Sequence, residues 1–192
     1  QDCCARSRIL VEDSVFDDFL EGFLTAVAGV VVGDPSLPET EMGPLISKAQ
    51  HERVSSFIDG SSEVLYQATS PSGDGFFFPP TVLLAPSPTA RVVTEEIFGP
   101  VVVVQRFTDE AEAIALANDH QFGLASVLYT ENYRTAMKVA NAIESGELYV
   151  NRTPADPYQG YHAGWKRSGL GGDDGKHGML EFTQTRLVVM KY

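Results

Sequence analysis

The stretch that decides the fold is "PVVVVQRFTDEAEAIALANDHQFGLASVLYTENYRTAMKVANAIESGELYVN", residues 100–151. Its first eight residues are a nearly continuous apolar run, typical of a strand buried on both faces. Apolar and helical segments then alternate in the order strand 100–107, helix 108–119, strand 123–130, helix 131–146 and strand 147–151. Short links between such segments predict parallel strands joined by right-handed crossovers, so we expect an α/β fold.

Both kinds of element also precede this stretch. We expect a strand at 7–14, a helix from an N-cap at Ser14, a Pro/Gly loop at 33–44, a helix from Ser47 to Gly60, and a strand at 62–68. Asp109 and Glu112 have the spacing of a capping box at the start of the helix at 108–119. The stretch "FFFPPTVLLAPSP" at 76–88 is extended, and we expect Pro79 and Pro80 to exclude it from a central strand position.

The alternation ends after Asn151. Residues 152–178 form an irregular segment with seven glycines, and its aromatic residues Tyr158, Tyr161 and Trp165 argue against disorder. Long irregular segments in compact domains are usually functional when they are ordered. A short helix at 178–182 is expected next, and "TQTRLVVMKY" at 183–192 has the pattern of a strand with no obvious partner in the chain.

Composition excludes several classes of partner. The formal net charge is −12 over 192 residues, which disfavours nucleic acid and anionic membrane surfaces. No apolar run is long enough to span a bilayer, and the N-terminus lacks the layout of a secretory signal. Two adjacent cysteines do not make a disulfide framework, and with four histidines they give no zinc-type spacing, so we expect no metal site and a reducing, cytoplasmic compartment.

Cys3 is the first candidate for chemistry. It stands beside Gln1, Asp2 and Arg6. Either it is a nucleophile, whose thiolate a nearby cation would favour, or it is a small cysteine that packs in a core. Composition and spacing leave both interpretations open, because nothing in the chain is clearly its base.

Two further segments each allow a surface role and a binding role. In "TEEIFGPV" at 94–101, Glu95 and Glu96 are either a solvated turn or include a carboxylate that holds sugar hydroxyls, with Phe98 as a flat wall. In "DPYQGYHAGWKRSG", Asp156 and His162 belong either to a surface loop or to a ligand loop that binds hydroxyl groups. The following "GLGGDDG" does not follow a strand and open a helix, so it is a weak phosphate loop.

Six blocks taken in order resemble the C-terminal, catalytic-domain portion of the aldehyde dehydrogenase superfamily. They are "QDCC", "GDP…MGPLIS", "FFFPPTVL", "EEIFGPV", "ANDHQFGLAS" and "GELYVN", and they run through essentially the whole chain. The tail "QGYHAGWKRSGLGGDDGKHGMLEFTQT" is most similar to the lactaldehyde/glycolaldehyde dehydrogenase branch. The resemblance implies a parallel-sheet catalytic domain at 1–182 and an oligomerisation strand at 183–192, with the N-terminal dinucleotide-binding domain absent from this chain.

The resemblance also implies roles for individual residues. Cys3, two positions after the Gln, would be the nucleophile, and Cys4 a structural neighbour. Glu96 would hold the nicotinamide-ribose hydroxyls and Phe98 would bound the nicotinamide ring of NAD or NADP. Asp156 and His162 would contact a hydroxylated substrate, although "TPADPY" around Asp156 departs from the wording of the branch.

The implied reaction is oxidation of a small hydroxyaldehyde to the carboxylic acid through a cysteine thiohemiacetal and thioester. The general-base Glu and the oxyanion Asn of the family would lie before Gln1, so we expect this chain alone to be inactive and to need its own N-terminal half in a homo-oligomer, a dimer or tetramer. Three alternatives stay open. They are an aminoaldehyde or semialdehyde dehydrogenase with Asp156 receiving the amine, a non-catalytic assembly domain, and a cofactor-free cysteine hydrolase that uses His162.

Overall fold

A computed structural model describes residues 1–71, 73–153 and 157–192. The chain divides into two compact units, Gln1–His120 (unit 1) and Gln121–Tyr192 (unit 2). Within the described residues, no helix is both long enough and apolar enough to cross a lipid bilayer. The predicted boundary between a catalytic domain at 1–182 and an oligomerisation strand at 183–192 is a statement about subunit assembly and stays a prediction.

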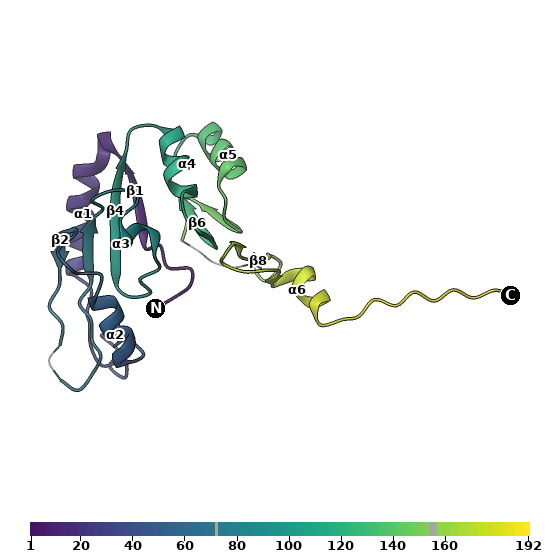
Figure 1. The fold of residues 1–192 in the computed structure, drawn as a ribbon, viewed down its shortest axis with the longest axis horizontal. Helices are drawn as coiled ribbons and strands as arrows, with labels where there is room; N and C mark the ends of the chain where they lie inside the picture. Colours follow the sequence, from purple (N-terminus) through teal and green to yellow (C-terminus); the bar gives the residue numbers. More distant parts are fainter. Residues whose placement is uncertain (72, 154–156) are drawn as a thin grey trace. The chain divides into compact units, whose positions relative to one another are not determined.

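Unit 1 is built on a mixed four-stranded sheet (Figure 1). Its elements are β1 (Arg8–Glu12), the 3₁₀ turn η1 (Asp13–Val15), α1 (Phe16–Ala28), α2 (Lys48–Ser55), β2 (Glu63–Gln67), β3 (Thr81–Leu84), α3 (Arg91–Thr94), β4 (Val101–Phe107) and α4 (Glu110–Asn118). The strand order is β1-β4-β3-β2, with β4 parallel to both β1 and β3 and with β2 antiparallel to β3. This confirms the α/β class.

Apolar residues cover both faces of this sheet. On one face, α1 packs through Phe16, Phe19, Leu20, Phe23, Leu24 and Val27 against strand residues that include Val104. On the other face, Val54 and Phe57 from the α2 region and Val92 and Val93 from α3 pack against Val101 and Val103. Alternate residues of β4 thus enter opposite cores, which explains why its sequence is a continuous apolar run.

The predicted helix starts are right in two cases and wrong in one. Ser47 caps α2 by accepting a hydrogen bond from Gln50 N–H at 3.2 Å, and Asp109 caps α4 by accepting from Glu112 N–H at 2.9 Å. Ser14 does not cap α1, because it lies inside the 3₁₀ turn and its hydroxyl donates to a Glu12 carboxylate oxygen at 3.2 Å. The helix that starts after Ser47 ends at Ser55, five residues before the expected stop.

The expectation about Pro79 and Pro80 is wrong. β3 is an inner strand of the sheet, hydrogen-bonded to β2 on one side and β4 on the other. Both prolines precede its first residue, Thr81, whose N–H donates to Pro100 O at 2.9 Å. A proline lacks a backbone N–H donor only at its own position. Two prolines directly before a strand therefore leave the hydrogen bonds of that strand to its neighbours intact.

Arg8 joins β1 to the end of α4. Its guanidinium donates to Leu116 O at 3.3 Å and to Ala117 O at 3.0 Å, two carbonyls in the last turn of the helix. Burial lowers the pKa of Arg8 from its ordinary value, and the charge of Asp119 partly opposes this. A cation at the C-terminal end of a helix stabilises carbonyls that have no partner within the helix.

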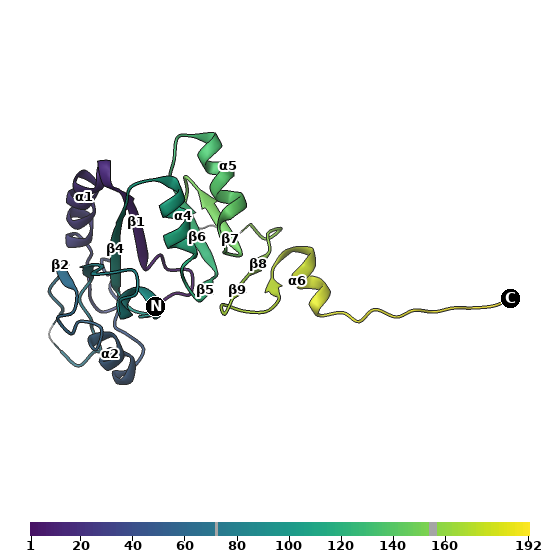
Figure 2. The same cartoon turned by 45° about the horizontal axis from the view of Figure 1, so that its top comes forward.

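Unit 2 contains a parallel strand pair and two small antiparallel pairs (Figure 2). Its elements are β5 (Phe122–Gly123), β6 (Ala125–Leu128), α5 (Tyr133–Ala142), β7 (Glu147–Val150), β8 (His162–Ala163), β9 (Trp165–Lys166), β10 (Gly172–Asp173) and α6 (Gly175–Glu181). The parallel pair β6 and β7, joined by α5, confirms one predicted crossover. The expectation that β4 continues the same sheet is wrong, because β1 and β3 occupy both of its edges.

The described residues from Pro157 to Asp173 include three short strands that pair with other parts of unit 2 or with one another. β8 pairs with β10, and β9 pairs with β5. A Cβ at Gly146 would lie 1.6 Å from Ala163 O, so only glycine allows β8 to lie this close to the start of β7. After α6, residues 183–192 run as an extended segment with exposed Leu187 and Val189 and no strand pairing in the described structure (Figure 1). The oligomerisation strand therefore stays a prediction.

Candidate active site

Cys3 lies in an exposed turn before β1. Its Sγ is 3.8 Å from a carboxylate oxygen of Asp2 and 4.0 Å from Cys4 Sγ, so the two thiols are adjacent but not joined in a disulfide. Arg6 donates to Cys4 O at 3.2 Å. Within this chain the Cys3 side chain is exposed, and its role as nucleophile stays a prediction.

The Cys3 turn is tied to the segment that precedes α2. The side-chain oxygen of Gln1 accepts a hydrogen bond from Ile46 N–H at 2.8 Å. Ile46 directly precedes the N-cap of α2. The position of the turn is therefore linked to the position of α2.

The same helix holds the loop that contains Glu96 and Phe98. Arg53 donates to Glu96 O at 2.7 Å, and the side-chain amide of Gln50 donates to Ile97 O at 3.2 Å and to Phe98 O at 3.0 Å. We call Gln50 and Arg53 the α2 clamp. Through Gln1 and the α2 clamp, one short segment of unit 1 positions both the candidate nucleophile and the candidate cofactor loop.

Phe98 adopts a strained backbone conformation. Its φ is +57°, in the left-handed region that non-glycine residues rarely occupy, and its side chain is 37% exposed. Such strain costs about 1–3 kcal/mol and persists only where neighbouring contacts enforce it. Here the α2 clamp supplies those contacts, and the following Gly99 lies so close to Val54 that a Cβ would be 2.6 Å from a methyl carbon.

The two adjacent carboxylates of this loop differ in their surroundings. Glu95 pairs with Arg91 at 3.3 Å on an exposed surface. The Glu96 side chain is exposed, and its carboxylate has no hydrogen-bond or ion-pair partner in the described parts of the chain. Of the two, Glu95 is therefore the carboxylate engaged in an ion pair, and the cofactor-binding role of Glu96 stays a prediction.

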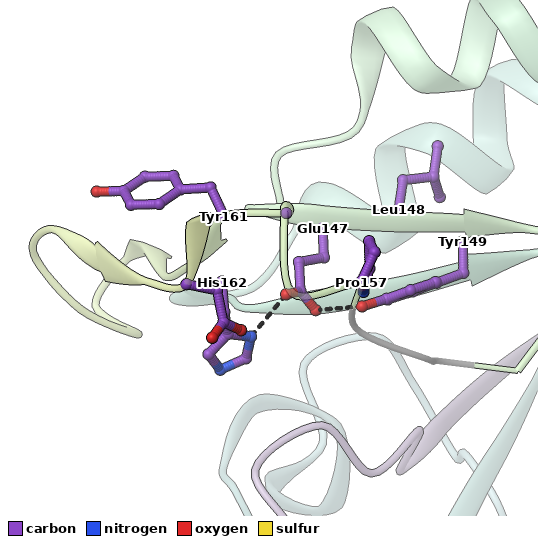
Figure 3. Close-up of a pocket in the computed structure, with 8 residues that line it drawn as sticks. Glu147, Leu148, Tyr149, Pro157, Tyr161 and His162 are labelled. Atoms are coloured by element: carbon purple, nitrogen blue, oxygen red, sulfur yellow. Dashed lines mark hydrogen bonds and ion pairs between the residues drawn. The ribbon is translucent and has the colours of Figure 1, made fainter. Parts of the chain in front are cut away.

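Unit 2 contains an open pocket of about 180 Å³ beside His162 (Figure 3). Its lining residues are Glu147, Leu148, Tyr149, Pro157, Gly160, Tyr161, His162 and Asp174. His162 Nδ1 lies 2.6 Å from a carboxylate oxygen of Glu147. The predicted site residue Asp156 lies outside the described residues, whereas His162 lies at this pocket, whose lining is more apolar than polar.

Comparison with known proteins identifies the family. The profile of the Aldehyde dehydrogenase family matches residues 1–188. The chain belongs to this family. Lactaldehyde dehydrogenase of Escherichia coli (strain K12) is 37% identical over 196 residues, which cover 100% of this chain and 41% of that relative. The family prediction made from the six sequence blocks is confirmed.

Solved structures of family members match the fold closely. The crystal structure of lactaldehyde dehydrogenase from Escherichia coli matches with a TM-score of 0.92 at 38% identity, covering 98% of this chain and 40% of that one. Betaine aldehyde dehydrogenase from Staphylococcus aureus in complex with NAD⁺ matches with a TM-score of 0.89 at 35% identity, covering 94% and 38%. The chain thus spans about two fifths of the length of the relatives that it matches.

The sequence did not reveal three residues of these sites. Gln50 and Arg53 lie on the polar side of an amphipathic helix, where their targets, three backbone carbonyls, leave no trace in side-chain patterns. Glu147 is the first residue of a strand that we predicted from its apolar residues alone. The signal that could have pointed to it is an acidic residue that begins a half-buried strand, directly after a glycine.

Proposed function

We propose that the gene product carrying this chain oxidises a small hydroxyaldehyde to the carboxylic acid with NAD or NADP. In this proposal the chain contributes the nucleophile Cys3, part of the cofactor site and part of the substrate site. The observation that carries the proposal is the similarity to lactaldehyde dehydrogenase over the full length of this chain, with Cys3 in an exposed turn.

Cys3 would act as the covalent catalyst. Its thiolate adds to the aldehyde carbonyl, forming a C–S bond and a thiohemiacetal whose oxyanion the Cys3 backbone N–H would hold in part. Loss of the former aldehyde hydrogen as hydride leaves a thioester on Cys3. Attack by water releases the carboxylic acid and regenerates the thiol, a step that needs a general base.

Glu96 and Phe98 fit a nicotinamide cofactor chemically. A carboxylate is an acceptor-only group, and the ribose hydroxyls of such a cofactor are donors. The partly exposed ring of Phe98, a residue whose backbone carbonyl accepts a hydrogen bond from Gln50, offers a flat apolar wall. When bound, the cofactor supplies the acceptor for the hydride. Glu96 and Phe98 would orient it and perform no bond chemistry themselves.

His162 and Asp156 would form the substrate end of the site. His162, which lies at the pocket of unit 2 and pairs with Glu147 at 2.6 Å, would offer a polar group to a hydroxyl-bearing aldehyde. The match to betaine aldehyde dehydrogenase at 35% identity keeps an aminoaldehyde substrate as the second candidate. In that case Asp156 would receive the cationic nitrogen.

The decisive experiment uses the full-length gene product that contains this chain and measures its reduction of NAD⁺ and NADP⁺ with glycolaldehyde, lactaldehyde and an aminoaldehyde. We expect oxidation of the hydroxyaldehydes, loss of activity in Cys3→Ser, and retained activity in the matched control Cys4→Ser. Loss of activity in Cys4→Ser, with activity retained in Cys3→Ser, would show that Cys3 is not the nucleophile. Absence of any oxidation, together with Cys3 alkylation no faster than in denatured protein, would favour a non-catalytic assembly domain.

We also propose that residues 1–192 alone are inactive and that 183–192 join subunits. The chain spans about two fifths of the length of its relatives. Residues 187–190 expose apolar side chains along an extended backbone, which suits addition to the sheet of another subunit. Removal of 183–192 should lower the oligomeric state measured by light scattering.

A further inference from the structure

Gln1 joins the turn that carries Cys3 to a second segment of unit 1. Its side-chain oxygen accepts a hydrogen bond from Ile46 N–H at 2.8 Å. Residues 2–5 form a turn in which Ala5 N–H donates to Asp2 O at 3.2 Å, and Cys3 occupies one of the two central positions. Because Gln1 directly precedes this turn, its contact with Ile46 restrains the turn at the end nearest to Cys3.

The core of unit 1 fixes the position of the donor. The side chain of Ile46 is 81% exposed, so packing of that side chain does not hold the residue in place. Its neighbour Leu45 is buried and donates from its backbone N–H to Phe76 O at 2.9 Å. On the other side, Ser47 caps α2. The backbone of Ile46 is therefore held between a buried residue and a capped helix.

The same helix fixes the loop at 96–98. Its α2 clamp donates three hydrogen bonds to carbonyl oxygens of this loop. Val54 of α2 is fully buried, and the following Gly99 lies against it. The helix α2 is thus a common reference for the candidate nucleophile at its N-terminal end and for the candidate cofactor loop along its side.

The hydride step of the proposed reaction needs both parts at the same moment. The carbon that loses the hydride is bonded to Cys3, and the accepting ring would lie against Phe98. Binding of the cofactor uses the loop alone, and reaction of the thiol with a small reagent uses Cys3 alone. A shift of the Cys3 turn relative to α2 should therefore slow the hydride step, because rates depend steeply on the alignment of reacting atoms.

We propose that Gln1 is a positioning residue that keeps Cys3 in register with the loop at 96–98 through α2. This inference rests on the proposed function and deepens it, because it adds a residue that acts on the hydride step without touching substrate or cofactor. The role requires an acceptor oxygen at the end of the side chain. Glutamate keeps such an oxygen, whereas methionine has a similar length and lacks it.

The first test measures the contact itself in the full-length gene product that contains this chain. Hydrogen exchange of the Ile46 amide is followed by mass spectrometry of overlapping peptides. Gln1→Met should speed this exchange roughly fivefold, as for one lost neutral hydrogen bond, and Gln1→Glu should not. The peptide that covers 95–100 should keep its protection in both variants. Equal exchange of the Ile46 amide in the wild type and in Gln1→Met would overturn the inference.

The second test separates positioning from a general structural role. The hydride step is measured as cofactor reduction in the first turnover, and the thiol as alkylation of Cys3 by iodoacetamide, followed by mass spectrometry of its peptide. Gln1→Met should slow the first turnover roughly fivefold and leave KM for the cofactor and the alkylation rate unchanged. Gln1→Glu should retain most of the wild-type rate. An unchanged first turnover in Gln1→Met, or a parallel loss of alkylation, would refute the positioning role.

The matched control is Lys48→Met, which removes an exposed side chain two residues after Ile46 and should leave all three measurements unchanged. If the wild-type protein oxidises no aldehyde, the proposed function fails. Exchange of the Ile46 amide still decides in that case whether Gln1 holds the Cys3 turn to α2.

Discussion

Removing the α2 clamp should loosen the Glu96–Phe98 loop without unfolding unit 1. The perturbation is Gln50→Ala combined with Arg53→Met, which deletes three hydrogen bonds to loop carbonyls. A hydrogen bond from a charged donor contributes about 1.5–3 kcal/mol and a neutral one about 0.5–1.5 kcal/mol. Because Arg53 is exposed, we take the lower limits, which together give about 2.5 kcal/mol.

This stabilisation is comparable to the strain at Phe98, which costs about 1–3 kcal/mol. Without the clamp, nothing equivalent offsets the left-handed backbone, so the loop should open locally. Hydrogen exchange followed by mass spectrometry should show exchange roughly 60-fold faster in the peptide that covers 95–100. Peptides from β3 and β4 should keep their protection, because their core contacts are unchanged.

The matched control is Lys48→Met on the same helix. Among the described residues, the one ion pair of Lys48 is an exposed contact with Glu52 at 3.7 Å, so its removal should not affect exchange in the loop. Unchanged exchange in the double variant would refute the reasoning that the clamp enforces the Phe98 conformation. So would a uniform loss of protection across unit 1, because it would mean that the clamp stabilises the whole unit.

Three further predictions concern stability. Gly146→Ala should destabilise unit 2 by roughly 3 kcal/mol in thermal unfolding, because its Cβ would lie 1.6 Å from a carbonyl oxygen. The control Gly22→Ala in α1 should be neutral or stabilising, because no atom lies within 4 Å of the added Cβ. Hydrogen bonds from Thr108 lower the pKa of Glu112 below its ordinary value of 4.5, so their contribution to stability is present above that pH and is lost as the pH falls through the lowered pKa. Glu112→Gln should therefore reduce the loss of stability in acid, and an unchanged acid limb of the unfolding midpoint would contradict this. Arg8→Met should cost about 1–3 kcal/mol in urea unfolding and speed exchange in the last turn of α4, and unaltered exchange there would show that the two carbonyl contacts do not hold the helix end.

Several local features followed from sequence patterns because their causes are local. The apolar spacing of 15–27 predicts the helix whose residues face the sheet, and Ser47 and Asp109 predict helix starts through bonds to N–H groups three residues away. The prediction that Ser14 caps a helix was wrong for a comparably local reason, because its hydroxyl donates to the carboxylate of Glu12, two residues away. The helix ends were less predictable, because no single residue type enforces them at Ser55 or Ala142.

Strand partners were the main failure, because pairing joins residues that are distant in sequence. The alternation in 100–151 predicts that each strand is followed by a helix, and it cannot say that β1 and β3 occupy both edges of β4. The prolines before Thr81 likewise restrict two positions and do not restrict the strand that starts after them.

The sequence by itself determined the family, the α/β class and the candidate residues Cys3, Glu96, Phe98 and His162, because short ordered blocks and local periodicity carry that information. Only the tertiary structure decided which groups position these residues. The α2 clamp acts on backbone carbonyls more than forty residues away, and Glu147 pairs with His162, fifteen positions later in the sequence. Such contacts depend on where the chain returns in space, and hydrogen bonds to backbone atoms impose no side-chain pattern on the segment that receives them.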